Sequence, residues 1–142
     1  MPPAFFPLTT QIGEHQRMSE IAFTLPFALP SLNVRDRQHW SKRRKLKQWM
    51  HLEVLLAIKC QRPSSPWRHV KVTVERCSSG CLDTDNCYGS FKPLGDVLKN
   101  IGIIEDDRSD WLTLEMKQSR AAPGEGQTIV RIEHVGSFGG AA

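Results

Sequence analysis

Residues 70–102 have the sequence VKVTVERCSSGCLDTDNCYGSFKPLGDVLKNIG, and the spacing of the apolar residues changes within this stretch. Over residues 70–74, valine alternates with polar residues, which predicts a half-buried β-strand. After residue 90, apolar residues recur every three or four positions. This spacing predicts a helix that is capped by Ser90, tolerates Pro93 in its first turn and ends at Gly102. Residues 77–89, rich in Cys, Ser, Gly and Asp, are expected to form a loop between the two.

Upstream of this stretch, the sequence predicts one more strand and a longer helix. Residues 21–27 alternate as a strand, and Pro26 favours an edge position or the strand end. A helix is expected from Ser41, as its cap, to about Cys60. Its core face is expected to comprise Leu46, Trp49, Met50, Val54, Ala57 and Ile58.

Downstream, residues 112–116 and residues 130–132 alternate as two further strands. The segment 121–127, with its proline and glycines, predicts a hairpin turn between them. The element order strand, helix, strand, helix, strand, strand indicates a single α+β domain. We expect a mixed sheet of about four strands together with two helices.

The length and composition agree with one globular domain. The chain has 142 residues, of which 39% are hydrophobic and 24% charged. Residues 1–17 are expected to be a flexible arm, residues 18–135 the domain and residues 136–142 a flexible tail. The arm lacks the features of a secretory signal, so a cytoplasmic location is expected, and Met18 is a candidate for the true start. No stretch approaches the roughly 18 apolar residues of a membrane span.

The net charge of +4 conceals two charged blocks of opposite sign. Between Arg35 and Lys47 there are seven basic residues and one acid, a net of +6. Between Asp83 and Asp110 there are seven acids and three basic residues, a net of −4. A cationic surface together with a carboxylate cluster indicates a polyanionic partner and a divalent metal ion.

The cysteines allow a zinc hypothesis, which their spacing does not favour. Cys77, Cys81 and Cys87 lack the paired C-x2-C arrangement typical of zinc sites, so free thiols are the preferred interpretation.

The acidic block carries the candidate chemistry. In an extended chain Asp83 and Asp85 face the same side, and two adjacent carboxylates favour a shared cation such as Mg²⁺. Lys92 and Asp96, four residues apart on the predicted helix, share one face of it. Each feature alone also has a simpler interpretation, as a solvated turn or a surface ion pair.

Taken together, three motifs resemble the RusA family of Holliday junction resolvases. They are the run Leu82-Asp83-Thr84-Asp85-Asn86, the spacing Lys92-x-x-x-Asp96-x-Leu98, and the run Gly102-Ile103-Ile104-Glu105-Asp106-Asp107. The upstream Leu29-Pro30-Ser31-Leu32-Asn33 and the basic stretch after it are similar too. The resemblance spans about residues 21–133. It implies a homodimeric, Mg²⁺-dependent endonuclease of phage or bacterial cytoplasm that nicks four-way DNA junctions symmetrically, with Mn²⁺ as an alternative metal.

By motif, the family's metal ligands map onto Asp83, Asp85 and Asp107, and its catalytic lysine maps onto Lys92. Compared with the family pattern, Cys87-Tyr88-Gly89 looks like an insertion before Lys92, and Lys99 is the second candidate for the lysine. We expect Asp96 or Asp106 to orient Lys92 or a metal-bound water. Asn86 is expected either to donate to a phosphate or to brace the loop.

The basic block is expected to bind DNA phosphates. Its members are Arg35, Arg37, Lys42, Arg43, Arg44, Lys45 and Lys47. The neighbouring Trp40 has two interpretations: a buried or stapling role, which is favoured, or stacking on an unpaired base at a junction centre. Three alternative functions remain open. They are a non-catalytic DNA-binding module of the same fold, a nuclease that prefers forks or flaps, and a small zinc protein.

Overall fold

The computed structural model describes residues 19–31, 39–59, 61–106, 108 and 111–135. Several sequence-based expectations fall outside these ranges and are not addressed by the structure. They are the arm 1–17, the start at Met18, the tail 136–142, and the residues Arg35, Arg37, Cys60 and Asp107.

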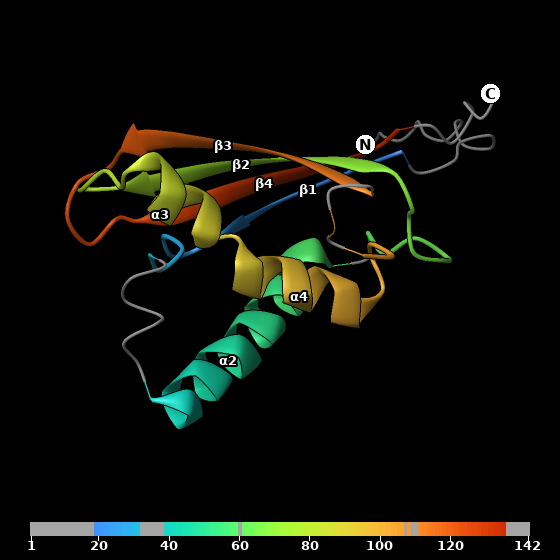
Figure 1. Ribbon diagram of the computed structural model, residues 1–142, viewed down its shortest axis with the longest axis horizontal. Helices are drawn as coiled ribbons and strands as arrows, with labels where there is room; N and C mark the ends of the chain where they lie inside the picture. The colour runs from blue at the N-terminus through green and yellow to red at the C-terminus, as the bar shows by residue number, and fades with distance from the viewer. Residues whose placement is uncertain (1–18, 32–38, 60, 107, 109–110, 136–142) are drawn as a thin grey trace, which may run out of the picture.

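The predicted α+β architecture with a four-stranded mixed sheet is confirmed (Figure 1). The strands follow the spatial order β1-β4-β2-β3, in which β2 and β3 are parallel and the other pairs are antiparallel. The hairpin turn expected over residues 121–127 was therefore wrong, because β2 lies between β3 and β4 and the segment connects two strands that do not pair. The first strand lies at a sheet edge, as its proline indicated. The bounds are β1 (Glu20–Leu25), β2 (Val70–Ser78), β3 (Leu112–Arg120) and β4 (Gln127–His134).

The helices lie on one side of the sheet (Figure 1). They are α2 (Trp40–Ile58), α3 (Thr84–Gly89) and α4 (Lys92–Ile101). The core lies between the sheet and the helices, because alternate residues of each strand are buried on that side. The sheet contributes two cross-strand rows of side chains to the core: Ile21, Ile132, Val72 and Leu114, and then Phe23, Val130, Val74 and Met116.

Helix α2 begins earlier than expected and buries a narrower face. Its cap is His39 rather than Ser41, because the His39 Nδ1 atom accepts a hydrogen bond from the Ser41 backbone N–H at 3.2 Å. The buried stripe consists of Met50, Val54 and Ile58. Trp49 was expected in the core but is 42% exposed, and its ring packs at the margin of the core against Phe27 with centroids 4.3 Å apart.

The segment expected to be a loop is shorter and contains a helix. Strand β2 continues to Ser78, and α3 occupies residues 84–89, so the apparent insertion Cys87-Tyr88-Gly89 forms the second half of α3. Ser90 closes α3 rather than capping α4. Its N–H donates to the Asn86 carbonyl at 3.0 Å and its hydroxyl donates to the Cys87 carbonyl at 2.6 Å.

Helix α4 has the predicted C-terminal end and the predicted proline in its first turn, but its N-cap is Phe91 rather than Ser90. Pro93 lies in its first turn, where no intrahelical N–H donor is needed. Gly102 ends it in the left-handed conformation with φ of 94°, which an L-residue adopts only with strain. The helix packs its apolar stripe into the core and turns its polar residues toward α2 and solvent.

Candidate metal and nucleic-acid site

A polar row on the inner face of the sheet supports the candidate site. It follows directly after the two apolar rows, and its members pair across the strands in the order Leu25, Thr128, Arg76 and Gln118. Thr128 is fully buried and Arg76 is 8% exposed. Buried polar groups are stable only when they are hydrogen-bonded. The three polar side chains of this row, Thr128, Arg76 and Gln118, each donate a hydrogen bond to a backbone carbonyl outside the sheet.

These hydrogen bonds attach two segments to the sheet: the chain that follows β1 and the residue that precedes Asp83. Thr128 donates to the Phe27 carbonyl at 2.7 Å, and the Arg76 guanidinium donates to the Leu29 carbonyl at 2.8 Å. Gln118 clamps Leu82 with two 2.8 Å bonds, one to its N–H and one to its carbonyl. The residue immediately before Asp83 is therefore anchored to β3.

Gln118 was not identified from the sequence, although a signal exists. It occupies the inward-facing position that follows Leu112, Leu114 and Met116 in the alternation of β3. A polar side chain at an expected core position indicates a specific hydrogen-bond partner. Its partner Leu82 lies 36 residues away, so only the fold identifies it.

Asp83 is the N-cap of α3. Its carboxylate accepts a side-chain hydrogen bond from Asn86 and a weaker one from the Asn86 N–H at 3.5 Å. The side-chain bond from Asn86 lowers the pKa of Asp83 below its ordinary value, since it stabilises the charged form. Asn86 therefore braces the Asp83 carboxylate, and its alternative role of donating to a phosphate stays a prediction.

Asp85 lies in the first turn of α3, not in extended chain. The expected reason for a shared direction of Asp83 and Asp85 was therefore wrong, because residues two apart in a helix do not face the same side. Both carboxylates are exposed at the beginning of the same helix. They offer hard oxygen ligands, which suit Mg²⁺ when phosphate oxygens and waters complete its coordination.

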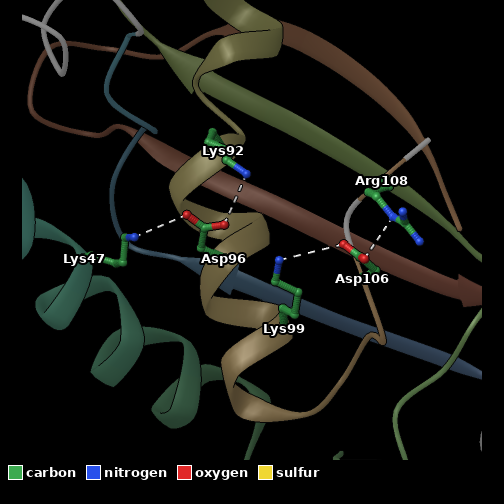
Figure 2. Close-up of polar contacts among 6 residues, drawn as sticks. All are labelled: Lys47, Lys92, Asp96, Lys99, Asp106 and Arg108. Carbon is green, nitrogen blue, oxygen red and sulfur yellow. Dashed lines mark hydrogen bonds and ion pairs between the residues drawn. The ribbon is translucent and has the colours of Figure 1, made fainter. Parts of the chain in front are cut away.

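Lys92 and Asp96 share one face of α4, as predicted, and form an ion pair with Nζ and Oδ1 3.4 Å apart (Figure 2). The second oxygen of Asp96 lies 3.2 Å from the Lys47 Nζ atom on α2. One carboxylate thus links the candidate catalytic lysine to the basic helix. Figure 2 shows both lysines reaching toward Asp96 from opposite sides.

Asp106 lies further along the chain and pairs with different cations (Figure 2). Its two carboxylate oxygens lie 3.7 Å from the Lys99 Nζ atom and 3.0 Å from the Arg108 Nε atom. Asp96 and Asp106 were grouped as orienting residues, and the structure separates them, since Asp96 is the one paired with Lys92. Lys99, the second candidate lysine, pairs with Asp106.

The described part of the chain contains no group of three or more His, Cys, Asp or Glu side chains that could hold a metal ion. The third expected ligand, Asp107, lies outside it. The same search finds no cysteine cluster, and Cys77, Cys81 and Cys87 are free thiols. Cys77, in β2, and Cys87, in α3, are buried, whereas Cys81 is exposed.

The described members of the basic block lie in the first two turns of α2. Its described members, Lys42, Arg43, Arg44, Lys45 and Lys47, are all exposed. The first turn contains no acidic residue, so these cations lie at the positive end of the helix dipole, where cations are unfavourable. A bound polyanion would relieve this repulsion, which gives the block a physical reason to attract phosphate.

Trp40 is the first residue of α2 and is 59% exposed, so the favoured buried role was wrong. Its indole lies beneath the guanidinium of Arg44, whose Cζ atom is 5.4 Å from the ring centroid. Trp40 also lines a groove of about 840 Å³ between α2 and α4. The groove reaches the candidate lysine, because Lys92, Pro93 and Asp96 form its opposite wall.

No protein-family model and no curated protein matches this chain. Among the helices of the described residues, none combines the length and apolar character needed to cross a membrane.

Proposed function

We propose that the protein is a Mg²⁺-dependent, structure-selective DNA endonuclease that resolves four-way junctions by hydrolysing phosphodiester bonds symmetrically as a homodimer in the cytoplasm. The observation that supports this most directly is the bridge from Lys92 through Asp96 to Lys47. It connects the candidate catalytic lysine at the beginning of α4 to a dense cationic helix. Phosphate binding and phosphate chemistry would then share one surface.

Each part of this surface has a distinct role in the proposal. Asp83 and Asp85, with Asp107, would hold the metal ion, which when bound supplies an activated water and relieves charge on the phosphate. Lys92 contacts the scissile phosphate and stabilises the charge that develops on it. Asp96 holds the Lys92 ammonium in place through their 3.4 Å ion pair.

The first turns of α2 bind the phosphates of the DNA arms. Such contacts give affinity without reading sequence and weaken with added salt. The anchoring of Leu82 by Gln118 fixes the position of the adjacent Asp83 relative to the sheet. A preorganised carboxylate loses less entropy when the metal and phosphate arrive.

The test compares cleavage of three labelled substrates: a four-way junction, a replication fork and a linear duplex. Wild type and Asp85→Asn are assayed with Mg²⁺ and with EDTA. We expect Mg²⁺-dependent, paired nicks in the junction for wild type and none for Asp85→Asn, which should still bind the junction because it loses a negative charge. Glu115→Gln, which also removes one carboxylate but from the outer sheet face, serves as the matched control.

Two other outcomes would replace the proposal. Cleavage of forks or flaps in preference to junctions would indicate a nuclease of another structural specificity. Binding of branched DNA without metal-dependent cleavage by wild type would indicate a non-catalytic module. Cleavage by Asp85→Asn at the wild-type rate would contradict the metal assignment.

A further inference from the structure

We propose that the groove between α2 and α4 binds an unpaired nucleobase of the DNA substrate, which stacks on Trp40. The inference rests on the proposed function for its biological context and adds a binding site for a single unstacked nucleotide. Its starting point is an exposed indole that lines a groove of about 840 Å³. This volume lies within the range of grooves that hold a small ligand.

The groove combines an apolar lining with positive charge. Leu46, Leu52 and Pro93 provide apolar surface beside the Trp40 ring, and Leu52 is 60% exposed. The charged lining consists of four cations and one carboxylate, a net of +3: Arg43, Arg44, Lys47, Lys92 and Asp96. A nucleotide matches both properties, because its base is a flat apolar face and its phosphate is an anion.

The charges stand close to the aromatic surface. The Arg44 guanidinium lies over the Trp40 ring, with its Cζ atom 5.4 Å from the ring centroid, so a cation is present next to the proposed stacking surface. Asp96, the one carboxylate of this lining, is held by Lys47 and Lys92 at 3.2 and 3.4 Å. The field that a ligand meets is therefore dominated by the arginines. The groove therefore favours an anionic ligand with an aromatic face over a peptide that lacks acidic residues.

The occupant is an unpaired base rather than duplex DNA. In a duplex the faces of the bases are covered by their neighbours and cannot reach an indole. At a branch point, or in a single strand, a base can turn out and stack on an aromatic side chain. Because Lys92 lines the same groove, a base held by Trp40 would lie next to the lysine that contacts the scissile phosphate, which couples branch recognition to cleavage.

The experiment measures binding by fluorescence anisotropy in EDTA, so that cleavage plays no part. The probes are a labelled 12-residue thymidine oligonucleotide and the same strand with abasic sites in place of the central bases. Wild type is expected to bind the intact strand about 10-fold more tightly than the abasic strand, since stacking on an aromatic side chain contributes on that order. Trp40→Ala should abolish this difference, and Trp40→Phe should retain most of it.

The matched control is Leu56→Ala, which truncates another exposed apolar side chain of α2, 72% exposed and outside the groove lining. It should bind both strands as wild type does. Equal wild-type affinity for intact and abasic strands overturns the inference and would favour another occupant such as a partner protein. An equal effect of Leu56→Ala and Trp40→Ala also overturns it.

This result is separable from the test of the proposed function. If the protein prefers the intact strand through Trp40 but never cleaves a junction, the base-binding site is supported and the nuclease proposal is wrong. If the protein cleaves junctions but shows no preference for the intact strand, the nuclease proposal is supported and the base-binding site is wrong. Circular dichroism of each variant verifies that α2 is intact.

Discussion

One carboxylate oxygen of Asp96 lies 3.4 Å from the Nζ atom of Lys92, which precedes it by four residues on α4, so Asp96 helps to position the lysine. The other oxygen is shared with Lys47 of α2. The side chain of Asp96 is only 20% exposed, whereas those of Lys92 and Lys47 are 59% and 47% exposed. The carboxylate is the fixed centre of the arrangement, and the two flexible lysines are arranged around it.

Asp96→Asn should reduce junction cleavage about 10- to 100-fold, the usual effect of removing a partner that orients a functional group. Binding of the junction should be unchanged or tighter because a negative charge is lost. Stability should fall by less than about 1 kcal/mol, since exposed ion pairs contribute little. Single-turnover cleavage and thermal melting measure the two effects, with Glu115→Gln as control, which breaks the ion pair to Lys71 on the outer sheet face. Wild-type cleavage by Asp96→Asn would remove Asp96 from the site.

Gln118→Ala should lower cleavage while leaving junction binding nearly intact. The substitution removes both hydrogen bonds to Leu82 and lets the start of α3, with Asp83, move away from the sheet. We expect roughly a 10-fold loss of rate, within the range reported for misplaced groups, and about 1–2 kcal/mol lower stability in urea.

Lys117→Ala is the matched control for Gln118→Ala, because it lies next in sequence on β3 but points to the exposed face. It should leave cleavage unchanged. Gln118→Glu keeps the acceptor for the Leu82 N–H and loses the donor, so it should fall between wild type and alanine. A parallel loss of binding and cleavage in Gln118→Ala would indicate general unfolding instead of a positioning role.

Asn86→Ala should raise the pKa of Asp83 toward its ordinary value of 3.8, because the side-chain bond from Asn86 is the largest cause of its lowering. With a depressed pKa in the folded protein, the stabilisation by ionised Asp83 is present above the unfolded value and is lost as the pH falls through the folded value. The pH-dependent part of the stability difference between wild type and variant should therefore vanish in strong acid.

Carboxyl-carbon NMR titration of Asp83 measures the pKa directly in both proteins. Asn100→Ala, on the exposed side of α4, should leave the titration of Asp83 as in wild type. An unchanged Asp83 titration in Asn86→Ala would show that the capping geometry alone sets the pKa.

Replacing Arg43, Arg44 and Lys45 with alanine should weaken junction binding and flatten its dependence on salt. Each lost phosphate contact lowers the slope of log affinity against log salt by about 0.9, so the slope should fall by up to about 3. The melting temperature at low salt should rise or stay constant, because cations at the positive end of the α2 dipole oppose folding. Electrophoretic binding assays from low to high salt measure the slope.

A second triple variant separates local contacts from net charge. It replaces three exposed cations of the outer sheet face and changes the net charge equally: Lys71, Lys117 and Arg131. It should bind the junction almost as wild type does. Equal weakening by the two triple variants would mean that α2 contributes only its charge and no contact.

The strands, the place of Pro93 in α4 and the end of α4 at Gly102 were predictable because their signals are local. Alternating valines in β2, Pro93 in the first turn of α4 and Gly102 in the left-handed conformation act through the backbone of the same segment. The pairing of Lys92 with Asp96 is equally local, since both lie within one helical turn. Charge segregation into a basic and an acidic block is likewise a property of the sequence alone.

The short helix α3 and the exposure of two tryptophans were not predictable in this way. The segment 77–89 has the composition of a loop, but the capping by Asp83 and the burial of Cys87 favour a helix there. Trp49 has the spacing of a core residue, and a buried or stapling role was favoured for Trp40 because aromatic side chains are usually buried. The face of α2 that is buried instead contains Met50, and both indoles remain exposed beside that face.

The sequence by itself determined the α+β class, the order of the strands and longer helices, and the segregation of charge, because these depend on neighbours within a few residues. Only the tertiary structure decided which polar groups meet across long separations. The register of β3 on β2 places Gln118 beside Leu82, and the packing of α4 against α2 places Asp96 beside Lys47. Those contacts arise from strand register and helix packing, which no local pattern encodes.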